Sequence, residues 1–354
     1  MHRVADQIVE ILEKAGVKRI YGIVGDSLNP VTDALRRRKT IEWIHVRHEE
    51  VAAFAASAEA QLSGNLAVCC GSSGPGNLHL INGLFDAHRN HAPVLAIASH
   101  IPQSQVGMEY FQATHPEQLF KECSAYAELV SEASQAPSIL MSAIQHAWAR
   151  RDVGVVVLPG DIADAPAEMK NLVHPPSYTR ENVVPEHESV SLLARMLDDH
   201  RRITFFCGAG CAGAEDKVVR LAHRLKAPIA YTWRGKDYFE HDNPLGIGMT
   251  GLLGWGDAYK AMHESDMLVL WGTDFPYFNF IPTKPEIVQI DRRGEVLGRR
   301  CRLDLGICGD VSVTAEALLN MVQEKTDSRH LDAALNRHAR DVKEMNAYME
   351  GNDK

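Results

Sequence analysis

The sequence predicts an α/β protein with two successive domains, each a parallel sheet covered by helices on both faces. Three observations carry this prediction. Short apolar runs alternate with amphipathic helical patterns along most of the chain. A proline-rich polar stretch interrupts the alternation once, at 162–188. At about 150 residues per domain, 354 residues also suggest two domains.

Composition narrows the class of protein. Hydrophobic residues make up 45% and charged residues 23%, as in ordinary soluble globular proteins. A net charge of −9 without basic runs argues against nucleic acid as a partner. Apolar runs such as 153–159 are far shorter than the ~20 residues that span a bilayer. The polar N-terminus is unlike a signal peptide, and seven cysteines without paired CxxC spacing indicate reduced thiols, so we expect a cytoplasmic protein.

The first predicted domain covers residues 1–180. Its strands are expected at 19–25, 41–47, 65–71, 93–99, 127–131 and 154–160. Helical patterns separate them at 4–14, 49–62, 77–89 and 137–150. The interrupting stretch, with Pro166, Pro175, Pro176 and Pro185, is interpreted as an interdomain linker.

The second predicted domain covers residues 183–330. Helices are expected at 189–197, 216–225 and 313–321, and strands at 203–207, 228–233, 266–271 and 286–291. In residues 331–354, apolar side chains recur at helical spacing. A packed helix and a connector are equal alternatives for this segment.

Glu49 is the first candidate for chemistry. It lies in Arg47-His48-Glu49-Glu50, where a strand ends and an alanine-rich helix begins. Ligands of parallel sheets bind beyond the carboxyl ends of strands, so a carboxylate here faces a predicted site. The alternative is a helix-end carboxylate, which the helix dipole favours by ~0.3–1 kcal/mol.

Two glycine-rich turns follow predicted strands. The loop 71–77 opens a helix and is either an anion-approach loop or a tight turn. The second, G-x-G-x-x-G at 208–213, lacks the acid expected about 20 residues later, which argues against a plain NAD site. Asp291 ends a later strand and is either a ribose ligand or a helix cap. The scattered histidines, His48 and His79 among them, show no metal-ligand spacing and are interpreted as surface or capping residues.

Several segments together resemble one family. GVKRIYGIVGDS at 16–27, RHEEVAAFAA at 47–56 and GPGN at 74–77 resemble the thiamine-diphosphate (ThDP) enzymes of the acetolactate synthase and pyruvate oxidase group. LHLINGLFD at 78–86, GMTGL at 248–252 and GTDFPY at 272–277 look most like the bacterial pyruvate dehydrogenases that reduce quinone. The resemblance extends over nearly the whole chain.

The resemblance implies a role for the first domain as the pyrimidine-binding domain. Glu49 matches the glutamate that shares a proton with the aminopyrimidine ring of ThDP, which activates the cofactor for attack on a 2-oxo acid. Gly25, Gly74 and Asn77 match positions that line the pyrimidine pocket. Phe111-Gln112 resembles the family's Phe-Gln-Glu near the substrate, although Ala113 stands third.

The resemblance likewise implies that the central domain binds FAD. The matching residues are Thr250, Gly251, Leu252, Leu253, Thr273, Asp274, Phe275, Pro276, Tyr277 and Asp291. Family members often have a proline three residues after this aspartate, where Gly294 stands here.

The family's Mg²⁺ and diphosphate site, with its Gly-Asp-Gly, has no match, because every Gly-Asp in this chain precedes Ser, Ile, Ala or Val. We therefore expect the Mg²⁺ ligands in a third domain that is missing here, and we expect the chain to be inactive alone. The implied function is oxidation of pyruvate to acetate and CO₂ with a quinone acceptor, in a homodimer or homotetramer, and the implied substrate class is pyruvate or another 2-oxo acid. A carboligase like acetolactate synthase and a non-catalytic FAD-binding or partner-binding module are the alternatives.

Overall fold

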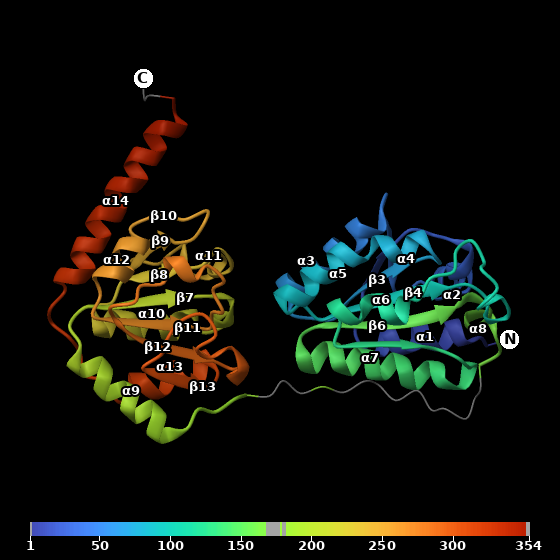
Figure 1. Cartoon of the computed structure of the whole chain (residues 1–354), viewed down its shortest axis with the longest axis horizontal. Coiled ribbons are helices and arrows are strands. Elements are labelled where there is room, and N and C mark those ends of the chain that lie inside the picture. The colour runs from blue at the N-terminus through green and yellow to red at the C-terminus, as the bar shows by residue number, and fades with distance from the viewer. Residues whose placement is uncertain (1, 168–177, 179–181, 352–354) are drawn as a thin grey trace. The chain divides into compact units, whose positions relative to one another are not determined.

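The computed structural model of the chain describes residues 2–167, 178 and 182–351. They divide into an N-terminal unit, Met1–Arg180, and a C-terminal unit, Glu181–Lys354 (Figure 1). Most of the predicted linker, at 168–177 and 179–181, lies outside the described residues. Its first residues belong instead to a short helix, α8 (Gly160–Asp164), so the linker prediction began too early.

The sheet of the N-terminal unit has six parallel strands in the order β2-β1-β3-β4-β6-β5. The strands are β1 (Arg19–Gly22), β2 (Glu42–His45), β3 (Ala67–Gly71), β4 (Val94–His100), β5 (Tyr126–Leu129) and β6 (Val153–Pro159). Because β2 lies on one side of β1 and β3 on the other, the winding direction reverses between β1 and β3. In open α/β sheets a crevice for ligands forms at such a switch point.

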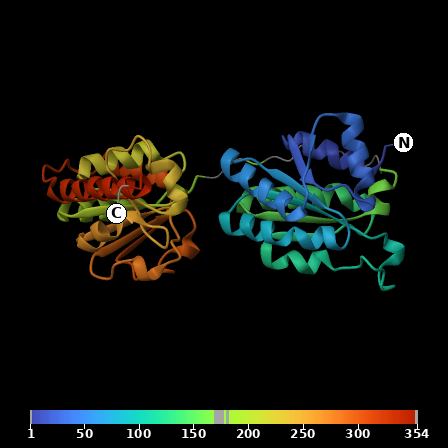
Figure 2. The same cartoon turned by 90° about the horizontal axis from the view of Figure 1, so that it is seen from above.

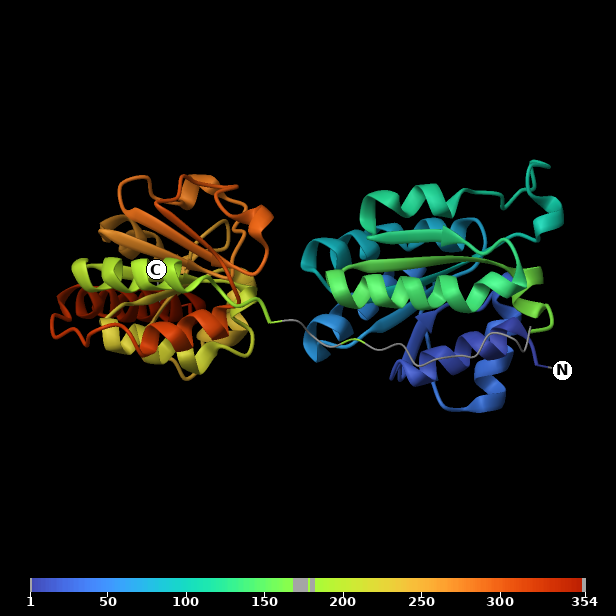
Figure 3. The same cartoon turned by 90° about the horizontal axis from the view of Figure 1, so that it is seen from below.

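Helices cover both faces of this sheet (Figures 1 and 3). One core contains side chains of α1 (Val4–Lys14), α2 (Asn29–Arg38), α7 (Ala136–Arg150) and α8. The other contains side chains of α3 (Glu49–Ser63) and α5 (Ile81–Asn90), beside α4 (Pro75–His79) and α6 (Pro116–Leu119). The single helix predicted at 77–89 is therefore two helices, and the first begins earlier because Pro75 suits the first turn.

The C-terminal unit, seen from above in Figure 2, has a seven-stranded sheet. Its strand order is β10-β9-β8-β7-β11-β12-β13, and only β10 runs antiparallel to its neighbour. The strands are β7 (Ile203–Cys207), β8 (Ile229–Tyr231), β9 (Gly246–Met249), β10 (Trp255–Gly256), β11 (Met267–Trp271), β12 (Glu286–Asp291) and β13 (Leu305–Cys308). Without β10 this is the strand order of dinucleotide-binding sheets, with its switch point between β7 and β11.

The C-terminal sheet is also covered on both faces. On one side pack α9 (His187–Asp199), α10 (Glu215–Leu225) and α13 (Val311–Leu319), and on the other α12 (Ala258–Glu264). The short α11 (Lys236–Phe239) follows β8. These two units confirm the predicted α/β class with two successive parallel-sheet domains.

Residues 329–349 form one long helix, α14 (Arg329–Met349), whose first half packs on the C-terminal unit (Figure 1). Arg337 forms a two-armed ion pair with the buried Asp257, with N–O distances of 2.6 and 2.8 Å. The ring of His330 bonds the buried Thr204 hydroxyl at 2.9 Å. Among the described residues, no helix combines the length and apolar character needed to cross a bilayer.

Candidate functional site

Glu49 is the first residue of α3 and lies at the switch point of the N-terminal sheet. The ring of His48 caps the helix, since its Nδ1 accepts from the backbone N–H of Glu50 at 3.2 Å. Only 8% of Glu49 is exposed. Its Oε2 is 3.0 Å from Nδ1 of His79, and its Oε1 would be 3.3 Å from a Cβ placed on Gly76. The carboxylate thus faces the glycine-rich loop that follows β3.

The loops after β1 and β3 touch across the switch point. A Cβ on Gly25 would lie 2.3 Å from the Ser72 hydroxyl, so only glycine allows this approach. The Ser27 hydroxyl is 2.9 Å from that of Ser72 and accepts from the Ser73 N–H at 3.0 Å. The backbone N–H of Ser73, in the loop after β3, is therefore used to hold the two loops together.

Gly74 and Gln112 meet in the same region. Gly74 has φ +66°, and a Cβ on it would lie 3.0 Å from that of Gln112. The Ser73 hydroxyl donates to Oε1 of Gln112 at 3.1 Å. Phe111, in contrast, is 82% exposed. The structure brings Gln112 to the predicted pocket and leaves Phe111 outside it.

Asn77 is completely buried beneath this loop. Its Nδ2 donates to the carbonyl of Ser99 on β4. Its Oδ1 has no hydrogen-bond partner among the described residues. A buried amide oxygen without a donor costs free energy, which a ligand or water with an N–H or O–H group would recover.

His79 is the residue that the sequence interpretation missed. It belongs to α4, bonds Glu49 and stacks on His48 with ring centroids 4.3 Å apart. Glu49 and His79 are 30 residues apart in sequence, so no local spacing joins them. The usable signal was topological, because Glu49 follows β2 and His79 follows β3, and these two strands lie on either side of β1 in the sheet.

In the C-terminal unit, the G-x-G turn after β7 packs against the turn after β11. Cβ atoms on Gly208 and Gly210 would lie 2.5 Å from Thr273 and 2.7 Å from Gly272. The Thr273 carbonyl accepts from Nε2 of Gln289 at 3.0 Å. These two glycines are therefore explained by close packing of two loops at the switch point.

The segments 250–253 and 275–277 meet at the same edge of the sheet. Gly251 has φ +115°, and a Cβ on it would lie 3.2 Å from the buried ring of Phe275. The Tyr277 ring packs edge-on to Phe275 at 5.4 Å. The Thr250 hydroxyl is buried and has no partner among the described residues. Exposed side chains complete the group: Leu252, Leu253, Pro276 and Tyr277.

The two predicted acids differ in their surroundings. Asp274 accepts from Arg299 at 3.0 Å and from Arg300 at 3.2 Å, so its charge is balanced within the unit. Asp291 ends β12 and is 5% exposed. It accepts from the Arg293 N–H at 3.0 Å, within a turn rather than at a helix cap. Burial raises the pKa of Asp291, and Arg293 partly opposes this shift.

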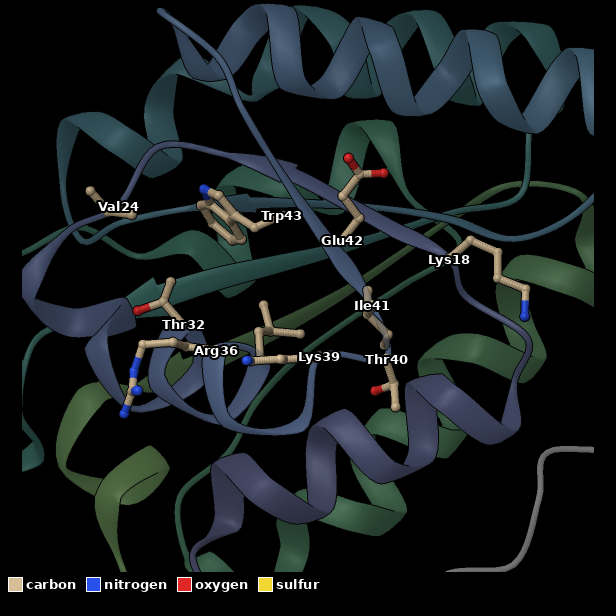
Figure 4. A pocket seen from close by; sticks show the side chains of 10 residues that line it. Lys18, Val24, Thr32, Arg36, Lys39, Thr40, Ile41, Glu42 and Trp43 are labelled. Atoms are coloured by element: carbon tan, nitrogen blue, oxygen red, sulfur yellow. The ribbon is translucent and has the colours of Figure 1, made fainter.

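A cavity of about 560 Å³ opens at the β2 edge of the N-terminal unit (Figure 4). The side chains around it include the basic Lys18, Arg36 and Lys39 together with Trp43. None of the predicted site residues lines it. The candidate site is therefore defined by strand ends and hydrogen bonds, and not by this cavity.

Comparison with known proteins gives matches to both units. Residues 2–120 match the family model described as "Thiamine pyrophosphate enzyme, N-terminal TPP binding domain". Residues 190–318 match "Thiamine pyrophosphate enzyme, central domain". Thiamine pyrophosphate is another name for ThDP, so both matches concern the family that the sequence resembles.

Three relatives illustrate the range of similarity. An uncharacterized 42.6 kDa protein of Pseudomonas amyloderamosa is 56% identical over 94% of this chain and 84% of its own length. A pyruvate oxidase of Lactiplantibacillus plantarum is 31% identical over 97% of this chain and 57% of its length. A chloroplastic acetolactate synthase of Arabidopsis thaliana is 27% identical over 93% and 50%.

The chain thus spans about half the length of the two relatives with a named activity. Both of its units match successive domains of one family, and the residues at the N-terminal switch point lie within the matched region. The chain belongs to the thiamine pyrophosphate enzyme family.

Proposed function

We propose that this chain supplies the pyrimidine half of a ThDP site and a flavin site in an enzyme that oxidatively decarboxylates a 2-oxo acid to CO₂ and the carboxylic acid one carbon shorter, with pyruvate as the proposed substrate and acetate as its product. One observation carries the proposal. Glu49 is a buried carboxylate at a strand-end switch point, with one oxygen bonded to His79 and the other facing a glycine loop. When bound, ThDP supplies an electron sink for decarboxylation, and FAD accepts the electrons.

The residues around Glu49 fit an aminopyrimidine ring. Oε1 of Glu49 faces Gly76, where a Cβ would lie only 3.3 Å away, so glycine leaves this carboxylate oxygen uncovered by a side chain. The unpartnered Oδ1 of Asn77 supplies a further acceptor nearby in the chain. Gly25 and Gly74 keep the surrounding loops close to each other. Together these features favour recognition of a ring that carries N–H donors.

Glu49 holds and moves a proton in this proposal. Its burial limits access of water, and a carboxyl group bonded to a ring nitrogen can share a proton with it. The hydrogen bond to His79 fixes Oε2, so the carboxylate presents Oε1 to the ligand. Gln112, held by Ser73, lies beside the loop and is proposed to contact the substrate.

The C-terminal unit has features that fit a dinucleotide with an isoalloxazine ring. The buried Thr250 hydroxyl lacks a partner, and Gly251 allows close approach to the aromatic pair Phe275 and Tyr277. Asp291 ends a strand near the switch point and is proposed to accept from ribose hydroxyls. We expect Asp274 to influence the flavin site by positioning Arg299 and Arg300, with which it pairs, and not by contacting the flavin itself.

A second candidate is a carboligase of the acetolactate synthase type. The similarity to the Arabidopsis enzyme over 93% of this chain favours it. The two activities differ in whether electrons pass from the substrate to the flavin. Reduction of bound flavin by pyruvate therefore separates them, and a quinone is the acceptor that we propose for the oxidase.

The proposed enzyme also needs Mg²⁺ ligands and a diphosphate site, which this sequence does not match. We propose that they come from a further domain and that the active protein is a homodimer or homotetramer. In such an assembly the glycine loops of the N-terminal unit would face the domain that binds the diphosphate.

Glu49→Gln tests the proposal in a fusion of this chain to the Mg²⁺-binding domain of a pyruvate oxidase. Glutamine keeps the shape of the side chain and cannot relay a proton. We expect the exchange of the thiazolium C2 proton of bound ThDP, followed by NMR, to slow by roughly 10²–10⁴-fold.

The matched control is Glu50→Gln, because Glu50 is the next residue and bonds the exposed Asn82 instead. Its exchange rate should equal that of the unsubstituted fusion. Equal rates in the Glu49→Gln and Glu50→Gln proteins would contradict the proposal.

A further inference from the structure

We propose that His48, Glu49 and His79 form a binding site for a divalent transition-metal ion such as Zn²⁺. These residues come from the turn after β2 and from α4, so two separate segments contribute ligands. One potential ligand atom from each residue lies within 4.8 Å of the other two. This site is separate from the Mg²⁺ site proposed for a further domain.

The distances are close to those of a metal site. Zn²⁺ bonds histidine nitrogen and carboxylate oxygen at about 2.0–2.2 Å, so ligand atoms on a tetrahedral ion lie about 3.3 Å apart. Nδ1 of His79 and Oε2 of Glu49 are already 3.0 Å apart. The His48 ring stacks on the His79 ring with centroids 4.3 Å apart, and one potential ligand atom of His48 lies within 4.8 Å of those of the other two residues.

The local charge favours a cation. Glu49 pairs with His79, and the neighbouring Glu50 carboxylate lies 3.8 Å from Nδ1 of His48. Within the described part of the chain, no Lys or Arg lies within 4.0 Å of either carboxylate. Two adjacent acids opposite two imidazoles therefore lack a permanent positive partner.

The ligand types select the kind of metal. Two imidazoles and one carboxylate suit Zn²⁺, Cu²⁺ or Ni²⁺, whereas Mg²⁺ prefers six oxygen ligands. The side chains of His48 and His79 are 45% and 44% exposed, which gives an ion access from solvent. A water molecule would complete the coordination of a three-ligand site.

Metal binding at this point has a consequence that rests on the proposed function. An ion bound at Oε2 of Glu49, beside His79, would withdraw negative charge from the carboxylate whose Oε1 is proposed to share a proton with the aminopyrimidine ring. Zn²⁺ and the thiamine cofactor are therefore expected to compete, which makes the metal an inhibitor of the enzyme.

Calorimetric titration of the 354-residue chain with ZnCl₂, without thiamine, tests the site. We expect one saturable site that His79→Gln or His48→Gln weakens roughly tenfold or more, since each removes a ligand. His2→Gln is the matched control. His2 also pairs with a glutamate, with its Nε2 3.1 Å from Oε1 of Glu10, but it does not belong to the group of His48, Glu49 and His79. MgCl₂ should give no comparable binding.

Unchanged Zn²⁺ affinity in both variants, or equal affinity for Mg²⁺, would overturn the assignment. Circular dichroism confirms that each variant is folded. A fluorescence titration of the fusion protein with ThDP, with and without Zn²⁺, separates the two proposals. Zn²⁺ binding that depends on His79 in a protein that does not bind ThDP would retain the metal site and reject the proposed function.

Discussion

At the residue scale, two buried acids at strand ends have different partners. Glu49 is hydrogen-bonded to a histidine ring that reaches solvent. Asp291 is bonded to a backbone N–H, and burial raises its pKa. An ionised carboxylate whose pKa is raised by burial costs folding free energy at neutral pH, and stability is gained as pH falls through the folded-state pKa. Groups whose pKa values are shifted by burial are found most often at functional sites, and this favours a binding role for Asp291.

The prediction for Asp291 separates binding from stability. We expect Asp291→Ala and Asp291→Asn to lower flavin retention at least tenfold, because charge-assisted hydrogen bonds contribute about 1.5–3 kcal/mol each. Asp291→Asn should not lower thermal stability at neutral pH, since it removes a buried charge and keeps an oxygen for the Arg293 N–H.

Absorbance of the purified chain measures flavin, and thermal melts measure stability. Asp266→Asn is the control, because Asp266 precedes the neighbouring parallel strand β11, at the opposite edge of the sheet from Asp291, and accepts from the Arg202 N–H. Full flavin retention in both Asp291 variants would remove Asp291 from the site.

The sequence identified Glu49 as a candidate site residue but did not identify His79, and the reason is physical. A carboxylate directly after a strand and before a helix is visible in a local pattern. A contact between residues 30 positions apart depends on which strands become neighbours. The order β2-β1-β3 creates that contact, and the alternating pattern predicts parallel strands without giving their order.

At the element scale, the position of α3 depends on its close contact with α5. A Cβ on Gly83 would lie 2.4 Å from Cβ of Ala53 and 2.6 Å from the backbone nitrogen of Phe54. The alanine-rich sequence of α3 permits this approach. The helix that begins with Glu49 is thereby fixed against the helix that follows His79.

We expect Gly83→Ala to destabilise the N-terminal unit by about 1–3 kcal/mol. Overpacking typically costs about 1–3 kcal/mol and occasionally more, and contacts of 2.4 and 2.6 Å with Ala53 and the Phe54 backbone place this site at the upper end. A net cost therefore remains after alanine's helix propensity returns about 1 kcal/mol. Urea denaturation followed by circular dichroism measures the change. Asn82→Ala, one residue earlier and exposed, should stay within about 0.5 kcal/mol, and an equal effect of both substitutions would contradict the packing argument.

The α14 helix is held partly by His330, whose pKa burial lowers below 6.5. Two arginines and two acids act on it from neighbouring elements: Arg202, Arg337, Glu264 and Asp266. Below pH 6.5 the unfolded chain binds a proton that the folded His330 does not, so stability falls as pH falls. The loss approaches about 1.4 kcal/mol per pH unit for one proton.

His330→Gln should reduce this loss between pH 7 and pH 5, because glutamine keeps a donor for Thr204 and does not titrate. Thermal melts at several pH values measure it. His263→Gln, at a half-buried position on α12, is the control and should leave the pH dependence unchanged. A slope equal to that of the unsubstituted protein would show that His330 titrates normally.

At the scale of the whole molecule, the alternating pattern predicted the class and the long buried strands. It missed β9, β10 and β13, which are short strands with few consecutive apolar residues. Gly246, Gly248 and Gly256 lie in β9 and β10, and glycine disfavours a strand assignment. These short strands depend on their neighbours in the sheet, and β9 and β10 also on α14, so they carry little local signal of their own.

The last prediction concerns the cofactor affinity of the 354-residue polypeptide itself. The N-terminal unit offers one carboxylate, one buried amide oxygen and closely packed glycine turns to a pyrimidine ring. The diphosphate needs Mg²⁺ with oxygen ligands in near-octahedral geometry, and the sequence has no Gly-Asp-Gly to match the family's ligands. We therefore expect weak ThDP binding that Mg²⁺ hardly improves, and no reduction of a dye by pyruvate. Calorimetry with ThDP, with and without Mg²⁺, measures this, and tight Mg²⁺-dependent binding would mean that other residues of this chain hold the diphosphate.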